Sequence, residues 1–326
     1  MGVFFSQAGV AVSVPAEIRM LARWKFLSCT FIAVIASPYC IWLTASADRP
    51  LWADESITVQ LVKSVSLKHM VSAILLGLDA TPPLYTGYAW LMLHYVVPVV
   101  SPELLLRVTN AGLIGAALWI LYLSIRHYFD QTTSLMTISL FIILEMAQLK
   151  FLTLEVRTYA AFVLFTMLTI YTALRAVARP HWIRLISTAL ASCMLVSSHT
   201  FGIVYAVSIA SCAVAAAAIE GKVRVAFKLG LTSVPAIVMF CLWVPILKQQ
   251  AQLGNWIPRP DLQRLLDSTY PPSNSLRLEG IAIILALVIV IWPRTQNSYG
   301  TVARRQWWRA TNGIYIFAIA IPIAFG

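Results

Sequence analysis

Long apolar runs alternate with short polar segments along most of this chain. A membrane-spanning helix needs about 20 consecutive, mainly apolar residues, and many of the runs approach that length. They lie at 26–46, 83–100, 104–125, 133–153, 158–174, 185–199, 200–219, 229–247, 279–292 and 310–326. The pattern predicts an all-α polytopic membrane protein, a bundle of about 8–10 transmembrane helices.

Two longer polar segments, 47–81 and 248–278, interrupt the runs. We expect both to be loops on the outer, non-cytoplasmic face of the membrane. Within the first loop, residues 67–78 are short and only partly apolar, which favours an interfacial helix over a span. The runs repeat with no fixed period, so we expect one membrane domain over 1–326. The last run reaches Gly326, an ending typical of a truncated copy.

Composition narrows the class further. Of the 326 residues, 60% are hydrophobic and 11% are charged, and the mean hydropathy is +0.79. Soluble domains carry about 25% charged residues. A soluble enzyme, a disordered chain and a nucleic-acid-binding protein are therefore excluded.

The net charge of +11 is concentrated in short loops between the runs. Basic residues collect in the cytoplasmic loops of membrane proteins. Three loops carry ten of them: Arg175, Arg179, Arg184, Lys222, Arg224, Lys228, Arg294, Arg304, Arg305 and Arg309. We expect these loops to be cytoplasmic and the turns around Glu155 and His199 to face outward.

The number of runs and the charge pattern disagree at one point. If the run at 26–46 leaves the cytoplasm and every later run crosses once, residues 175–184 fall outside, against their charge. Either the run at 83–100 does not cross fully, or those at 104–125 and 133–153 are shorter than they look. We give the charge pattern more weight.

Several acids are candidates for chemistry. Asp54 and Glu55 stand side by side just past the first run. A carboxylate at the membrane surface can act as a general base or as a metal ligand, and the alternative is a pair of solvated loop acids. Glu145 lies inside an apolar run, where a charge is costly, so it either faces an aqueous cavity or pairs across helices.

Three motifs in order resemble one family of membrane enzymes. They are the pair Asp54 and Glu55, the D-x-x-PPLY segment from Asp79 through Pro82 and Pro83 to Tyr85, and the LEVRTYA turn with Glu155, Arg157 and Tyr159. Together, over roughly residues 26 to 277, they look like the polyprenyl-phosphate-sugar glycosyltransferases of glycosyltransferase family 39. That family includes the protein O-mannosyltransferases and the aminoarabinose lipid A transferases. The resemblance implies a GT-C-like bundle whose outer-face loop carries interfacial helices.

The resemblance also implies roles for individual residues. Asp54 matches the catalytic base, with Glu55 beside it. The family often has a basic residue before the two prolines, where it meets the donor phosphate, and this chain has Thr81. The candidate substrate-binding residues are Asp79, Tyr85, Glu155, Tyr159 and Trp256. Trp256 lies in the second outer loop, where it could stack on a sugar or anchor the loop at the interface.

Phosphate chemistry supports the same grouping. A lipid-phosphate sugar donor loses a phosphate, and the charge that develops there must be stabilised. Arginine binds phosphate oxygens in two places, so Arg157 and Arg107 are the first candidates for the donor phosphate and Lys150 and His199 the second. The alternatives are snorkelling at the membrane edge for Arg107 and Lys150, and a satisfied interfacial histidine for His199.

We therefore expect an inverting transfer of sugar from a polyprenyl-phosphate donor to a glycolipid, polysaccharide or protein acceptor. The setting would be a bacterial inner membrane, with the site facing the periplasm. No nucleotide or zinc motif occurs, so no cofactor is expected, and a divalent metal ion is left open. A transporter or lipid flippase is one alternative, although the acids cluster on one face. A catalytically inactive relative is the other, given Thr81 and the abrupt end.

Overall fold

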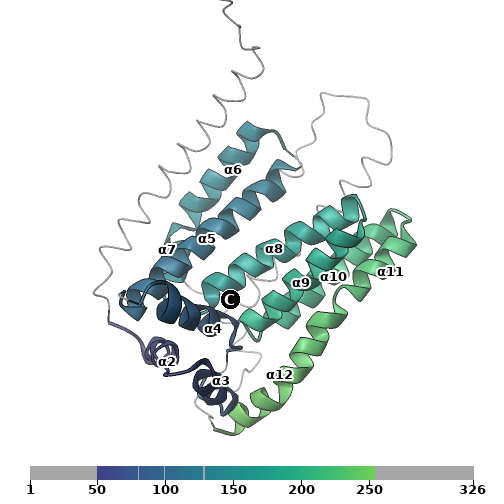
Figure 1. Ribbon diagram of the computed structural model, residues 1–326. Coiled ribbons are helices and arrows are strands. Elements are labelled where there is room, and N and C mark those ends of the chain that lie inside the picture. Colours follow the sequence, from purple (N-terminus) through teal and green to yellow (C-terminus); the bar gives the residue numbers. More distant parts are fainter. Residues whose placement is uncertain (1–49, 80, 99, 128, 254–326) are drawn as a thin grey trace, which may run out of the picture. The chain divides into compact units, whose positions relative to one another are not determined.

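The computed structural model describes residues 50–79, 81–98, 100–127 and 129–253 (Figure 1). The chain divides into two compact units, Met1–Ala45 and Ser46–Gly326, and all of the described residues belong to the second. About 81% of the described residues are helical and none is in a strand. The prediction of an all-α protein is confirmed for this part of the chain.

Four helical stretches are long and apolar enough to cross a membrane. They are α5 (Pro102–Arg126), α8 (Tyr159–Ala178), α10 (Gly202–Ile219) and Val223–Lys248, which comprises α11 (Val223–Leu231) and most of α12 (Val234–Leu253). A fifth is possible if the bent pair α6 (Gln131–Leu144) and α7 (Met146–Leu154) forms one span, and α9 (Trp182–Ser198) is apolar but shorter. Four or five such helices fit an integral membrane protein. The predicted spans at 26–46, 279–292 and 310–326 lie outside the described residues.

The run at 83–100 does not form a span-length helix. There, α4 (Leu84–Leu91) continues into a five-residue π-helical segment, η1 (Met92–Val96), and stops. At 1.5 Å per residue this helix is about 20 Å long, against a hydrocarbon core of roughly 30 Å. Lys63, at the end of α2, and Glu103, in the first turn of α5, form an ion pair at 3.6 Å. The chain therefore returns to the end of the bundle from which it left.

Two short helices precede α4, namely α2 (Ala53–Val62) and α3 (Leu67–Leu75), and α3 matches the predicted helix at 67–78. A glycine ends α3. Gly77 has a φ of 92°, and the amides of Gly77 and Leu78 donate back to carbonyls of the last helical turn. Only glycine adopts this backbone conformation at little cost. The turn directs the chain toward Asp79.

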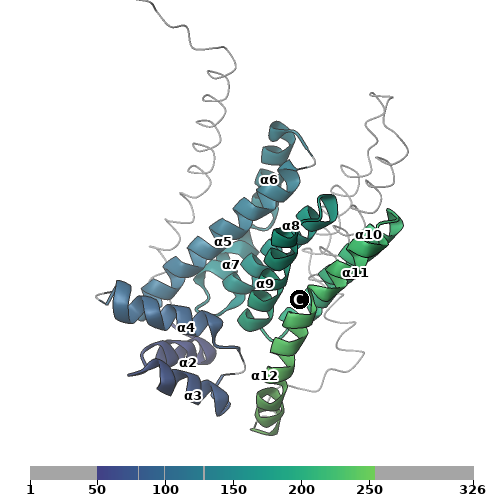
Figure 2. The ribbon, with the colours of Figure 1, turned by 45° about the vertical axis from the view of Figure 1, so that its right-hand side comes forward.

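The helix α8 is central to the described part of the chain. It packs against α5, α9 and α10, which lie beside it in both ribbon views (Figures 1 and 2). The buried surface shared by these helices is rich in alanine, including Ala173, Ala176, Ala213, Ala216 and Ala217. Small side chains let apolar helices approach closely, which is how helices in lipid gain van der Waals contact.

The helix termini meet in two groups. At the first, which we name the site end, the turn between α7 and α8 contacts α2 and the C-terminus of α9. At the second, the basic end, His127 after α5 lies in the electrostatic field of Arg175, Arg179 and Arg184 in the α8–α9 turn. Acidic and basic candidate residues are thus separated along the helix axes.

Candidate functional site

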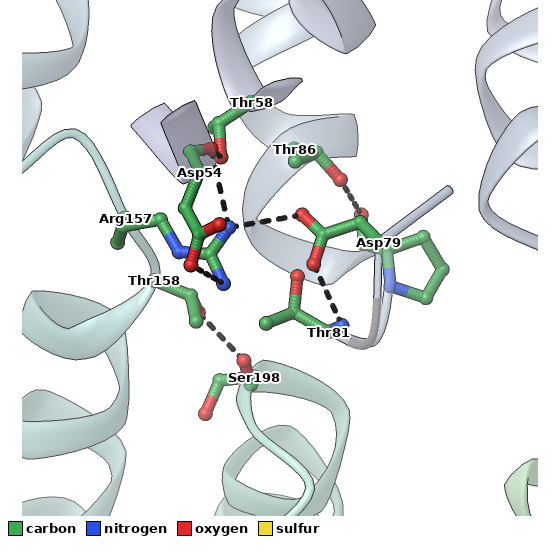
Figure 3. Close-up of polar contacts among 9 residues, drawn as sticks. Asp54, Thr58, Asp79, Thr81, Thr86, Arg157, Thr158 and Ser198 are labelled. Atoms are coloured by element: carbon green, nitrogen blue, oxygen red, sulfur yellow. Dashed lines mark hydrogen bonds and ion pairs between the residues drawn. The ribbon is translucent and has the colours of Figure 1, made fainter. Parts of the chain in front are cut away.

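Arg157 lies in the turn between α7 and α8, with its guanidinium between two aspartates. Its Nη1 lies 3.5 Å from Asp79 Oδ2, and its Nη2 lies 4.0 Å from Asp54 Oδ2. Nη1 also donates to the main-chain carbonyl of Asp54 at 3.3 Å. Figure 3 shows the two carboxylates approaching the guanidinium from different segments of the chain. The Arg157 side chain is 12% exposed, so its charge depends on these partners.

The two neighbouring acids of α2 have different surroundings. The Asp54 side chain is 54% exposed, whereas Glu55 is fully buried. The two carboxylate oxygens of Glu55 accept main-chain amides at 2.8 Å, one from Trp52 at the helix start and one from Val156 beside Arg157. The positive end of the helix dipole also favours a carboxylate in this first turn. Glu55 therefore fastens α2 to the turn that carries Arg157, and Asp54 is the acid that faces outward.

Asp79 is the buried partner of Arg157, with a side chain only 2% exposed. Its Oδ1 accepts the amide of Thr81 at 3.0 Å. This local turn, typical of aspartate, leads the chain into Pro82, Pro83 and α4. Thr81, where a basic residue was expected from the family, is buried, and the positive charge beside Asp79 is that of Arg157.

A further set of buried polar groups ties α4 and α5 to the same turn. The Tyr85 hydroxyl donates to Asn110 Oδ1 at 2.8 Å, and Asn110 Nδ2 donates to the Glu155 carbonyl at 2.5 Å. Burial raises the pKa of Tyr85 far above its usual range, so the hydroxyl keeps its proton. Arg107, one turn before Asn110 on α5, is fully buried. Snorkelling of Arg107 to the membrane edge is therefore wrong.

His199, which follows α9, lies on the other side of this turn. The Thr158 hydroxyl donates to the Ser198 carbonyl at 2.6 Å, and the rings of His199 and Tyr159 are 5.6 Å apart. Burial, and secondarily the charge of Arg157, lowers the pKa of His199 to about 4. Its Nδ1 accepts a main-chain amide at 3.2 Å. At neutral pH the ring is uncharged with its proton on Nε2, so it can donate a hydrogen bond but adds no positive charge.

The structure brings most of the sequence-predicted site residues together. The contacts above connect seven of them: Asp54, Glu55, Asp79, Glu155, Arg157, Tyr159 and His199. Tyr85 joins this group through Asn110. Lys150 lies on α7 with an exposed side chain. Trp256 lies outside the described residues. Within the part of the chain that is described, no group of three or more His, Cys, Asp and Glu is arranged to hold a metal ion.

Asn110 and Thr158 belong to the site but were missed at the level of sequence, and the contact of Thr158 with Ser198 was not expected. Asn110 did carry a signal, because an amide inside an apolar run needs an internal partner. Thr158 and Ser198 act through a hydroxyl and a main-chain carbonyl, which no sequence pattern marks. Glu145 lies at the break between α6 and α7 and not inside a continuous helix.

No family model, curated protein or solved structure matches this chain. The helices themselves define the class: a helical protein whose long apolar helices fit a membrane.

Proposed function

We propose that this chain is a membrane glycosyltransferase that takes a sugar from a polyprenyl-phosphate donor. The observation that carries the proposal is the exposed carboxylate of Asp54, 4.0 Å from the largely buried guanidinium of Arg157. A base for an acceptor hydroxyl and a cation for a phosphate leaving group are the two groups that this transfer needs. Here they stand side by side.

The proposed reaction is one displacement at the anomeric carbon. The acceptor hydroxyl attacks from the face opposite the phosphate, and Asp54 takes its proton. The bond from the anomeric carbon to the phosphate oxygen breaks, and the lipid phosphate leaves with the electron pair. Arg157 exchanges a carboxylate contact for the phosphate, which its fork binds in two places. The configuration at the anomeric carbon is inverted.

The other residues of the site support these two groups. Asp79 holds Arg157 in place, and Glu55 fixes the start of α2 that presents Asp54. The neutral ring of His199 can donate its Nε2 proton in a hydrogen bond to a phosphate or sugar oxygen. Tyr159 lies against His199 and can contact the same substrate.

We place the site end on the outer face of a bacterial inner membrane. The basic end carries Arg175, Arg179 and Arg184, and such loops are retained in the cytoplasm. A polyprenyl-phosphate sugar presented on the periplasmic leaflet would then reach Asp54 and Arg157. The acceptor would be a glycolipid, a polysaccharide or a protein.

The competing proposal is a transporter or lipid flippase, because buried ion pairs such as Asp79–Arg157 also occur in transport proteins. The position of the Asp79–Arg157 pair favours the enzyme over the transporter. The pair joins a helix–helix turn to the segment before α4, whereas transport sites lie near the bilayer midplane between repeated halves.

Transfer of labelled sugar in membranes that contain the full chain tests the proposal. Asp54→Asn should lower the rate by about 100- to 10,000-fold, the usual contribution of a general base. Glu103→Gln is the matched control, because Glu103 is a surface acid at the same end that pairs with Lys63, and it should keep full activity. Full transfer by Asp54→Asn would contradict the base assignment. Movement of the lipid across the membrane without any transfer product would favour the flippase.

A further inference from the structure

The basic end carries a cluster of positive charge that the proposed function does not use. Arg175 lies in the last turn of α8, Arg179 follows that helix, and Arg184 lies in the first turn of α9. Arg184 Nη1 donates to the carbonyl of Arg179 at 2.6 Å and to that of Arg175 at 3.3 Å. The three residues are thereby held together in one short turn.

The positive charge of this turn also reaches the end of α5. His127 follows α5, and its pKa is lowered first by burial and then by Arg175, Arg179 and Arg184. The cluster itself belongs to the α8–α9 turn.

Within the described residues, no carboxylate pairs with any of the three arginines. Ion pairs such as Lys63–Glu103, Arg157–Asp79 and Lys222–Glu220 lie elsewhere in the described part of the chain. The C-terminal dipole of α8 favours positive charge at this place, but it amounts to only about half an elementary charge. Three arginines in one short turn, with no carboxylate partner among the described residues, can therefore take an external anion.

The surroundings of the cluster indicate where that anion comes from. Trp182, at the start of α9, is 63% exposed, and a tryptophan at the end of an apolar helix is typical of the headgroup level of a bilayer. Ile183, Ile186 and Leu190 are also exposed, and their spacing forms an apolar stripe along α9. A phosphate next to this turn would have an apolar surface for its attached acyl chains.

We propose that the α8–α9 turn binds the headgroup of an anionic phospholipid. The phosphate contacts Arg175, Arg179 and Arg184, and the acyl chains lie along the α9 stripe. This lipid is a bound structural partner and not the sugar donor, so the proposal stands independently of the transfer reaction. Basic clusters at the ends of membrane helices lie at the level of the lipid headgroups, where they attract anionic lipids.

Native mass spectrometry of the full chain, purified in neutral detergent, tests this. The probes are phosphatidylglycerol, phosphatidylcholine with the same acyl chains, and inorganic phosphate. Phosphatidylglycerol should bind in preference to phosphatidylcholine. Arg179→Gln should weaken its binding about fivefold, the usual effect of one basic residue near an anionic headgroup. The Arg179 side chain makes no hydrogen bond within the described part of the chain, so this variant should keep the fold.

The control is Arg224→Gln on α11, an exposed basic residue outside the cluster, which should bind the lipid like the parent chain. The triple variant Arg175→Gln, Arg179→Gln and Arg184→Gln should lose the preference for phosphatidylglycerol altogether. Equal binding of the two lipids, or unchanged binding by Arg179→Gln and the triple variant, overturns the proposal. Full competition by inorganic phosphate at matched concentration overturns the assignment to a lipid and identifies a free-anion site.

Discussion

Arg157 Nη1 lies 3.5 Å from Asp79 Oδ2, and both side chains are almost withdrawn from solvent. The contact joins the α7–α8 turn to the segment that precedes α4. Each residue neutralises the charge of its partner, and neither charge would be stable alone in this buried position. The position of Arg157, and with it the proposed phosphate site, therefore depends on a residue that touches no substrate in the proposed mechanism.

Removing one partner of this pair should cost more than removing both. Arg157→Gln leaves Asp79 buried without its cation, and we expect a loss of about 3 kcal/mol in the free energy of unfolding. Adding Asp79→Asn removes the remaining charge and should restore part of that stability. Thermal unfolding in detergent of the parent chain, both single variants and the double variant measures the coupling. Strictly additive losses would contradict a direct interaction.

The two acids of α2 should behave differently when each is changed to its amide. Glu55→Gln replaces one of the two carboxylate oxygens, both of which accept a main-chain amide, with an NH2 group that cannot accept. It should lower the free energy of unfolding by about 1–3 kcal/mol. Asp54→Asn removes the charge of an exposed side chain whose contact with Arg157 is long, 4.0 Å. It should lower the free energy of unfolding by less than about 1 kcal/mol. The same unfolding measurement compares them. Equal losses would mean that the inward and outward assignments of Glu55 and Asp54 are wrong.

Much of the fold follows from the apolar runs, and its main departure has a local cause. The run at 158–174 became α8 and the run at 200–219 became α10, because long apolar segments satisfy their backbone only as helices. The run at 83–100 is also long and mainly apolar, but its helix ended at Val96. Pro98 disfavours the helical conformation of Val97 before it and donates no amide. Hydropathy alone ignores this signal, although it was present in the sequence.

The candidate site was less accessible to sequence reasoning. Adjacent helical residues point about 100° apart, so Asp54 and Glu55 could have different surroundings. Which of them turns inward depends on the Val156 amide, which is distant in sequence. The buried partner Asp79 and the amide of Asn110 likewise acquire their roles only through tertiary contacts.

The start of α10 has room for glycine alone. A Cβ on Gly202 would overlap the main chain of Leu195 and Val196 in α9. Gly202→Ala should therefore push the two helices apart, cost about 1–3 kcal/mol and disturb the adjacent His199. Gly115→Ala on α5 is the control, because a Cβ there meets nothing within 4 Å. It should be neutral or stabilising by up to about 1 kcal/mol. If both variants unfold alike, this close helix approach is not present.

His199 should give the fold a specific dependence on pH. Its pKa is about 4 in the folded chain and about 6.5 in an unfolded one. Below pH 6.5 the unfolded chain therefore binds more protons, and stability falls as the pH drops toward 4. The contribution is fully present above pH 6.5. Unfolding of the parent chain and His199→Gln between pH 4 and 8 should differ in slope only in the acidic part of this range. Parallel profiles throughout would show that His199 is not buried as a neutral ring.

The path of the chain through the membrane can be mapped with single cysteines, after replacement of Cys29, Cys40, Cys193, Cys212 and Cys241. Lys68→Cys and Glu103→Cys lie before and after the run at 83–100, and the Lys63–Glu103 contact places the end of α2 beside the start of α5. Both should react with an impermeant thiol reagent from the same side as Asp54→Cys.

Arg179→Cys and Arg224→Cys, at the helix ends opposite the site, should react only after the membrane is opened. Labelling of Lys68→Cys and Glu103→Cys from opposite sides would mean that the run at 83–100 crosses after all. Labelling of Asp54→Cys only from the cytoplasmic side would invert the orientation. A donor on the periplasmic leaflet could then not reach Arg157. The proposed enzyme would need a donor in the cytoplasmic leaflet, or the glycosyltransferase proposal would be wrong.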